Sequence, residues 1–339
     1  MKIAVDAMGG DFAPENVIAG VALALQHSGG RFEMVLTGIA DKVQPLLESH
    51  GLAGKVELID TPDVIEMHES ASVAVKTKQN SSMVRGLTLC KEGKADGFVS
   101  MGNTGAQMAA SLLVLGRIDG VSRPTIGSYF PNLAGMMMIF DVGANVDVKP
   151  EHLAQFAEMG SIYQHFVFKI DKPTVGLLNI GEEESKGTDT AKQTYKLLTE
   201  AHRAGRINFT GNIEGRDILK GKVSIVLCDG FTGNIILKFG ESVPQFLADV
   251  FKPAMMKEIQ AGKLSQEAAG TFSKLLKETL RNFDDEEYGG VPLLGVNGIS
   301  IIGHGKSSAK AIMNAIFRAE EMAQHRINER IAEALKVSA

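Results

Sequence analysis

The sequence predicts an α/β protein of three layers, in which a mostly parallel β-sheet lies between two layers of helices. Short runs of β-branched and apolar residues, typical of buried strands, recur along the chain. Helical patterns lie between most of these runs, and this alternation favours a parallel sheet that is covered on both faces. With 339 residues, of which 44% are hydrophobic, the chain is long enough to bury a full core.

Each predicted strand is an apolar run bounded by turn residues. These runs are residues 3–6, 32–37, 56–60, 97–100, 125–130, 136–141, 174–180, 207–210, 224–228 and 299–302. The sequence contains no internal repeat and no linker rich in proline or serine. We therefore expect one large α/β domain over residues 1–339.

Residues 241–283 depart from this alternation, because they are mostly helical, with an interruption around Ala261 and Gly262. The second helical part is amphipathic. Amphipathicity alone does not separate packing on a core or a second subunit, the commoner case, from contact with a membrane or a partner. We expect a helical excursion from the sheet that serves dimer, carrier-protein or membrane contact. Its apolar stripe comprises Phe272, Leu275, Leu276, Leu280 and Phe283.

The composition excludes several classes of protein. A formal net charge of -5 argues against broad nucleic-acid binding. The N-terminus lacks the long apolar segment of a signal peptide, and no apolar run approaches the ~20 residues that span a bilayer, so we expect a cytoplasmic protein. No cluster of histidine and cysteine has the spacing of a metal site, and no serine-hydrolase motif is present. The sequence therefore predicts no metal and no cofactor.

Four predicted strands end in turns that are rich in glycine, at residues 6–11, 100–106, 228–234 and 302–308. Glycine at such a junction more often solves a backbone problem than binds a ligand, so each turn alone is weak evidence. Ligands of open α/β sheets bind outside the carboxyl ends of the strands. Together the four turns predict one shared polar site.

The last of these turns resembles two phosphate-binding motifs and fits neither. A P-loop requires glycine where Ser300 stands, and the dinucleotide fingerprint requires glycine where Ser308 stands. A helix that begins after this turn still offers unpaired N–H groups to an anion. We expect a phosphate-sized anion there, near Lys306 and Ser307, with His304 as the one histidine in a candidate site.

A fifth segment, residues 177–195, follows a predicted strand and carries several charges. A solvated loop with Thr188 or Asp189 as helix N-cap explains it well. An anion site with Asn179 at the strand tip and Lys186 above the anion explains it equally well.

Seven segments in this order resemble the bacterial phosphate acyltransferases. They are MKIAVDAMGGDFAPENVIAG, SMGNTGA, DVGANVD, LLNIGEEESKG, GNIEGRD, LCDGFTGNIILK and EYGGVPLLGVNG, and they run over nearly the whole chain. The resemblance implies transfer of a long-chain acyl group from acyl carrier protein to inorganic phosphate, for phospholipid synthesis. It also implies a fold like isocitrate and isopropylmalate dehydrogenases, a homodimer, and peripheral attachment to the inner face of the cell membrane or to the next acyltransferase.

This chemistry needs neither a metal nor a covalent intermediate. Phosphate near pH 7 carries a charge of about −1.5 to −2, and a thiol with a pKa of about 8.5 leaves readily, so positioning and charge stabilisation can carry the reaction. Carboxylates that face phosphate would repel it, so we expect them to orient other groups.

The roles we expect are as follows. The candidate catalytic residues are Lys186, Asn179, Asn103 and Asp229, and the candidate phosphate-binding residues are Gly102, Thr104, Gly233, Asn234 and Lys306. The candidate orienting residues are Asp6, Gly9, Gly10 and His304. The candidates for contact with the acidic carrier protein or the membrane are Lys252, Lys257, Lys263, Lys274, Leu276, Lys277, Leu280 and Arg281.

Two other classes of function stay open at this stage. A dehydrogenase of the isocitrate type shares the implied fold, but the sequence lacks recognisable paired carboxylates for its metal and an arginine cluster for its substrate. A scaffold that binds lipid or carrier protein would show no phosphate-dependent loss of thioester.

Overall fold

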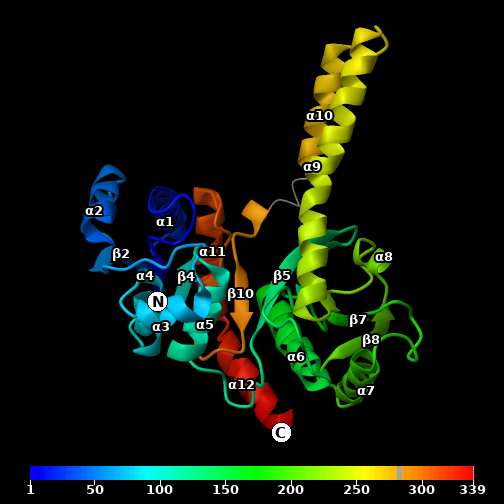
Figure 1. The fold of residues 1–339 in the computed structure, drawn as a ribbon, viewed down its shortest axis with the longest axis horizontal. Coiled ribbons are helices and arrows are strands. Elements are labelled where there is room, and N and C mark those ends of the chain that lie inside the picture. Colours follow the sequence, from blue (N-terminus) through cyan, green and yellow to red (C-terminus); the bar gives the residue numbers. More distant parts are fainter. Residues whose placement is uncertain (281–284, 339) are drawn as a thin grey trace.

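The computed structural model describes residues 1–280 and 285–338. Within these residues the strands form one sheet in the order β3-β2-β1-β4-β11-β10-β5-β6-β9-β7-β8 (Figure 1). The strands are β1 (Lys2–Asp6), β2 (Glu33–Gly38), β3 (Glu57–Asp60), β4 (Gly97–Ser100), β5 (Thr125–Asn132), β6 (Gly135–Phe140), β7 (Thr174–Leu178), β8 (Asn208–Ile213), β9 (Ile225–Leu227), β10 (Val291–Leu294) and β11 (Ile299–Ile302).

Helices cover both faces of this sheet, as the alternating pattern predicts. One buried cluster packs α1 (Glu15–Ser28), α2 (Ala40–Ser49), α6 (Pro150–Val167), α7 (Asp189–Arg203), α11 (Ala309–Gln324) and α12 (Ile327–Ser338) on one face. A second cluster packs α3 (Ala71–Thr77), α4 (Ser82–Lys91), α5 (Thr104–Val114), α8 (Gly215–Ile218) and α9 (Gly230–Gln260) on the other. Successive residues of β1 alternate between the clusters, since Ile3 and Val5 belong to the first and Ala4 to the second. The three-layer prediction is confirmed.

Every predicted strand is present, but the sequence reading missed β10. This strand is short, contains Pro292, and runs antiparallel to both of its neighbours, β11 and β5. Proline weakens the strand signal because it cannot donate to the ladder. Since β5 and β6 are also antiparallel, the parallel group β6-β9-β7-β8 runs opposite to the parallel group β3-β2-β1-β4-β11.

The middle of the sheet forms the floor of a pocket. The side chains of Ile126 and Phe130 on β5, Val291 on β10 and Ile302 on β11 line it, on the face that carries α5 and α9. Alternation along β5 turns Ile126, Ser128 and Phe130 toward the same side. The antiparallel strand that the sequence reading missed therefore belongs to the floor of the pocket.

The predicted helical excursion is a long hairpin that projects from the body of the molecule (Figure 1). It consists of α9 and α10 (Gln266–Leu280), and the predicted interruption is confirmed, because α9 ends at Gln260 with Ala261 as its C-cap, and Gly262 has φ +69. The helix that carries this excursion begins before the predicted bound at Glu241, because α9 starts at Gly230 and continues through two prolines. Arg281 and Phe283 lie outside the described residues. Among the helices within residues 1–280 and 285–338, none combines the length and apolar content needed to cross a membrane.

Candidate active site

The turns after β1 and β4 are joined by a buried carboxylate. Asp6, 3% exposed, accepts a hydrogen bond from Ser100 Oγ (2.8 Å) and another from the Met8 amide (3.1 Å). Ser100 Oγ in turn accepts the amide of Gly102 at 3.0 Å. Burial raises the pKa of Asp6 from its ordinary value. These contacts fit the predicted orienting role, because Asp6 fixes the turn that carries Gly102.

The turn after β11 packs beside these two. The Gly303 amide donates to the carbonyl of Ser100 (2.9 Å), and the Asp11 amide donates to the carbonyl of Gly305 (2.7 Å). A Cβ at Gly9 would lie 2.8 Å from the Gly102 amide, so the packing requires glycine there. Gly10, with φ +109, packs against the same carbonyl of Gly305. Three turns that are distant in sequence are thus one unit.

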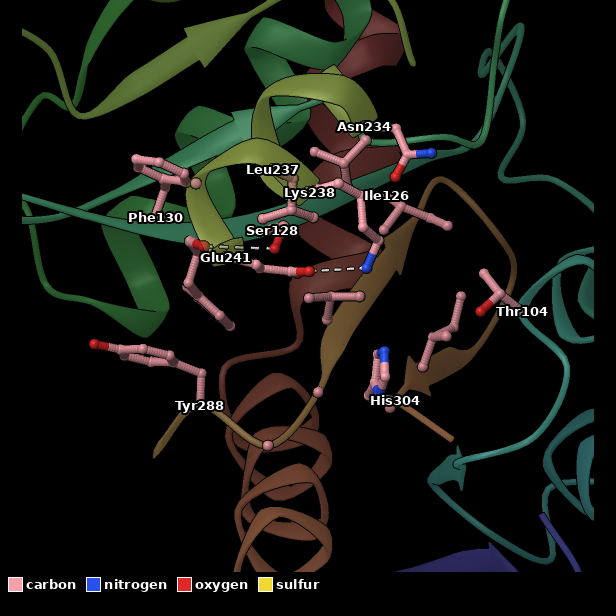
Figure 2. Close-up of a pocket in the computed structure, with 18 of the residues that line it drawn as sticks. Thr104, Ile126, Ser128, Phe130, Asn234, Leu237, Lys238, Glu241, Tyr288 and His304 are labelled. Atoms are coloured by element: carbon pink, nitrogen blue, oxygen red, sulfur yellow. Dashed lines mark hydrogen bonds and ion pairs between the residues drawn. The ribbon is translucent and has the colours of Figure 1, made fainter. Parts of the chain in front are cut away.

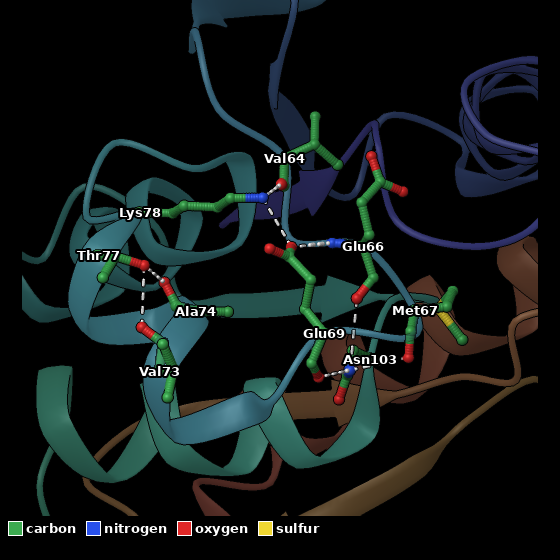
Figure 3. Close-up of polar contacts among 9 residues, drawn as sticks. All are labelled: Val64, Glu66, Met67, Glu69, Val73, Ala74, Thr77, Lys78 and Asn103. Carbon is green, nitrogen blue, oxygen red and sulfur yellow. Dashed lines mark hydrogen bonds and ion pairs between the residues drawn. The ribbon is translucent and has the colours of Figure 1, made fainter.

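Asn103 holds a neighbouring loop in place (Figure 3). Its Nδ2 group donates to the carbonyls of Glu66 (3.4 Å), Met67 (3.0 Å) and Glu69 (3.1 Å), while its Oδ1 atom caps α5 by accepting the Ala106 amide. These contacts occupy both ends of the side-chain amide. They favour a positioning role over the predicted hydrogen bond to an oxyanion.

Lys78 also holds this loop, residues 64–69, in place. Its ammonium group donates to the carbonyl of Val64 and to Glu69 Oε2, both at 2.7 Å (Figure 3). This ion pair lowers the pKa of Glu69. Met67 belongs to the same loop, and its side chain reaches the turn at Gly305. The loop therefore forms a wall beside the turn after β11.

On the other side of the pocket, α9 begins with a side-chain cap. Asp229 Oδ1 accepts the Thr232 amide (2.8 Å) and Asp229 Oδ2 accepts the Thr232 hydroxyl (2.9 Å). Helix capping explains why an aspartate stands at position 229. The predicted catalytic role of Asp229 stays a prediction. Glycine at position 233 is required by packing, because a Cβ there would overlap the backbone carbonyl oxygen of Asp141.

The sequence reading assigned no site role to Asp141, which is fully buried below the first turn of α9. Its Oδ1 atom accepts the amides of Gly143 (2.8 Å) and Ala144 (2.7 Å), and its Oδ2 atom accepts Asn145 Nδ2 (2.6 Å). Burial raises the pKa of Asp141 to about 6, although these hydrogen bonds favour the charged form. The DVGAN segment offered a signal, since its aspartate is the last residue of a predicted strand.

The raised pKa of Asp141 predicts a pH dependence of stability. Because the folded protein keeps a proton that the unfolded chain releases near 3.8, the contribution of Asp141 is present below pH 3.8 and is lost as the pH rises to about 6. The free energy of unfolding should fall over this range by roughly 3 kcal/mol relative to the Asp141→Asn variant. Urea unfolding at several pH values measures this difference, and a difference that does not vary with pH would contradict the assignment.

The turns after β4 and β11 face α9 across a cavity of about 220 Å³ (Figure 2). Thr104, the first residue of α5, lies on one side with His304 and Ser307, and Asn234 and Lys238 of α9 lie on the other. Three of the four predicted turns therefore line one pocket, and the β1 turn packs against two of them, the turns after β4 and β11. This arrangement combines polar groups at a helix N-terminus with the apolar floor of the sheet.

Lys238 is the cation of α9 in this pocket, and the sequence reading missed it. Its ammonium group pairs with Glu241 Oε2 at 2.9 Å, and its side chain is 54% exposed (Figure 2). Asn234, Lys238 and Glu241 follow one another at helical spacing, so they share one face of α9. That spacing is a signal from which Lys238 could have been found.

Asn179 and Lys186 lie in another loop, after β7, and are not among the residues that line the pocket. Asn179 Nδ2 donates to the carbonyl of Lys186 (3.1 Å), and the Lys186 side chain is exposed. Gly187, with φ +88, packs against Asn179. These contacts show how the loop is built, and the catalytic roles of both residues stay predictions. Lys306 is also exposed and lies one residue from the lining residue Ser307.

The lysines of the hairpin are on its surface, as a docking face requires. Lys252, Lys257, Lys263, Lys274 and Lys277 are all exposed. Leu276 and Leu280, by contrast, are half-buried and face a groove between α9 and α10.

Comparison with known proteins identifies the family of this chain. The family described as "Fatty acid synthesis protein" matches residues 1–330. A phosphate acyltransferase of Chlorobaculum parvum is 58% identical over 339 residues, covering 99% of each chain. The chain belongs to the phosphate acyltransferase family. Another phosphate acyltransferase, from Pelotomaculum thermopropionicum, is 45% identical and covers 99% of this chain and 95% of its own.

Solved structures place the phosphate acyltransferase chain in a known fold. A phosphotransacetylase from Streptococcus pyogenes superposes with a TM-score of 0.62 at 19% identity, over 96% of this chain and 94% of its own. A putative 4-hydroxythreonine-4-phosphate dehydrogenase from Salmonella typhimurium gives a TM-score of 0.53 at 12% identity, over 95% and 99%. The expected dehydrogenase-like fold is confirmed, and the family makes the chain an acyltransferase of lipid biosynthesis rather than a scaffold or a dehydrogenase.

Proposed function

We propose that the chain transfers a long-chain acyl group from acyl carrier protein to inorganic phosphate, giving acyl phosphate for phospholipid synthesis, in the pocket between α5 and α9. The observation that carries this proposal is the pairing, in one cavity, of an apolar floor with polar groups from three turns. The floor suits the carbons beside the thioester. The polar groups suit phosphate.

The proposed reaction is direct attack. A phosphate oxygen forms a bond to the carbonyl carbon of the thioester, the C–S bond breaks, and the departing thiolate takes a proton from water. The N-terminus of α5 at Thr104, the Ser307 hydroxyl and the Lys238 ammonium hold the phosphate, and the Asn234 side chain donates to the oxyanion. Phosphate is already charged near pH 7, so it needs no strong side-chain base.

The catalytic roles of Lys186 and Asn179 and the phosphate contact of Lys306 stay predictions, and a wider form of this proposal gives the two lysines a further part. Lys186 and Lys306 are exposed cations. In this form they attract phosphate and carrier protein toward the pocket, while Lys238 acts within it. Turnover of Lys186→Ala and of Lys238→Ala separates these parts.

The hairpin supplies the proposed contacts with macromolecules. Its exposed lysines suit the acidic carrier protein, so the apparent affinity for the carrier should fall as salt rises. Its exposed apolar residues include Phe246 (64%), Val250 (50%) and Leu275 (57%). They suit a second copy of the chain and the inner face of the cell membrane, with the body in the cytoplasm. Sedimentation of the protein alone tests the homodimer. Co-sedimentation with liposomes tests the membrane contact.

A trapping assay tests the reaction itself. Purified protein is incubated with palmitoyl-loaded acyl carrier protein and phosphate, and the acyl phosphate is trapped with hydroxylamine. We expect palmitoyl hydroxamate that depends on phosphate, and far less with the same acyl group on coenzyme A. If folded protein leaves the thioester unchanged, the proposed reaction is wrong for this chain.

A further inference from the structure

A second cavity continues from the pocket into the hairpin. It occupies about 1120 Å³ between α9 and α10. Glu241 and His304 line both cavities, so the groove opens at the pocket itself. The pocket, at about 220 Å³, is smaller than the ~300 Å³ at which ligand sites usually begin, so a long ligand that reacts there extends beyond it.

The groove has an apolar lining along both helices. On α9 the lining residues Pro244, Ala248, Phe251 and Met255 recur at helical spacing, and they run outward along the helix from Glu241 at the mouth. On α10 the apolar lining residues are Leu276 and Leu280, and they lie among Ser273, Lys274, Lys277 and Glu278. Phe251 also stacks edge to face on Phe272, with ring centroids 5.5 Å apart, which joins the two helices along the groove.

Charge is arranged at the edges of this lining. Lys252, Lys274 and Lys277 line the groove, and Lys274 lies 3.9 Å from Glu278. Long lysine side chains can cover apolar surface with their stems and keep the ammonium groups in water. Glu241, Glu278 and Glu287 also line it, so the groove is an apolar channel whose wet edges carry charges of both signs. A straight aliphatic chain fits the apolar side chains along this groove.

We propose that the groove between α9 and α10 binds the distal part of the acyl chain while the thioester carbon lies in the pocket. This inference rests on the proposed function and names the chain-length determinant of the same site. Continuity with the pocket favours this occupant over a second copy of the hairpin, which could pack against the outer apolar residues without entering the groove. Each methylene that enters the groove leaves water, so longer chains gain affinity.

Narrowing the groove tests this proposal. In Ala248→Trp an indole enters from the α9 wall, and in Ser273→Trp from the α10 wall. The matched control is Ala254→Trp, an exposed alanine of α9 that does not line the groove. For each variant, kcat/KM is measured with palmitoyl- and butyryl-loaded carrier protein. We expect the palmitoyl-to-butyryl ratio to fall by at least about tenfold in both groove variants, the loss of two or more buried methylenes, and to be unchanged in the control.

The outcomes separate this inference from the proposed reaction. Butyryl transfer shows that a variant is folded and that the reaction occurs. If the palmitoyl-to-butyryl ratio is unchanged in both groove variants, the inference is overturned and the proposed reaction still stands. A change in oligomeric mass without a change in this ratio leads to the same conclusion. If the wild-type protein transfers neither group, the reaction fails, and the groove is then tested by binding of carrier protein that bears an inert palmityl thioether. Equal binding by wild type and Ala248→Trp would overturn the inference in that case.

Discussion

Gly233→Ala is expected to lower the free energy of unfolding by about 3 kcal/mol, at the upper end of the usual cost of overpacking. The added Cβ would overlap the backbone carbonyl oxygen of Asp141, the residue that directly follows β6. The first turn of α9 would have to move, and Asn234 would move with it. We expect urea unfolding to show the loss, together with a loss of turnover.

Gly303→Ala is the matched comparison for this prediction. A Cβ there would overlap the Sδ atom of Met101 by a similar amount, but a methionine side chain can shift. We expect the cost to be about 1 kcal/mol. Equal costs for Gly233→Ala and Gly303→Ala would show that the close approach of α9 to Asp141 is not what requires glycine.

Lys238→Ala is expected to lower kcat/KM for phosphate by about 100-fold, the usual cost of losing one group that stabilises charge in the transition state. The side chain is 54% exposed and pairs with Glu241 on the same helix, so the melting temperature should change little. Lys238→Arg keeps the charge and should recover part of the loss. Steady-state kinetics with phosphate varied at saturating thioester measures the effect.

Two further lysines complete this comparison. Lys196→Ala removes an exposed lysine of α7 and should change nothing. Lys186→Ala tests the expectation drawn from sequence, which is a strong loss of turnover at an unchanged melting temperature. Because Lys186 does not line the pocket, the structure favours the larger loss in Lys238→Ala. The opposite order would move the reaction to the loop after β7.

Sequence patterns predicted the sheet well because its strands are short, apolar and bounded by turns. They failed at β10, where proline and antiparallel pairing hide the signal. They also gave the helical excursion a lower bound at Glu241, because helix spacing does not reveal that the helix capped by Asp229 continues without a break into the hairpin. Local pattern thus predicted the elements, whereas the reversal of strand direction depends on pairings that no local pattern records.

The residues that line the pocket were also predicted only in part, because local patterns do not record which turns meet. Glycine turns identify strand ends, so Thr104, Asn234 and Ser307 were found before their shared pocket was known. The same turns suggested catalytic roles for Asn103 and Asp229; the structure shows supporting contacts for both, and these roles stay predictions. Burial and hydrogen-bond partners distinguish a side chain that lines the pocket from one that supports a turn, and neither property can be read from glycine spacing.

The central claim is that the reaction takes place in the pocket between α5 and α9, and thiol labelling tests it most directly. The wild-type cysteines are poor targets, because burial raises the pKa of Cys90 to about 12 and that of Cys228 well above its ordinary value. One variant, Leu237→Cys, carries a thiol in the pocket, and the other, Ser185→Cys, carries it beside Lys186. Each is treated with a maleimide in the presence and absence of phosphate and acyl thioester.

We expect the label on Leu237→Cys to abolish acyl phosphate formation and the substrates to slow labelling. We expect Ser185→Cys to be labelled without loss of activity. Inactivation and substrate protection at Ser185→Cys, with neither at Leu237→Cys, would contradict the account.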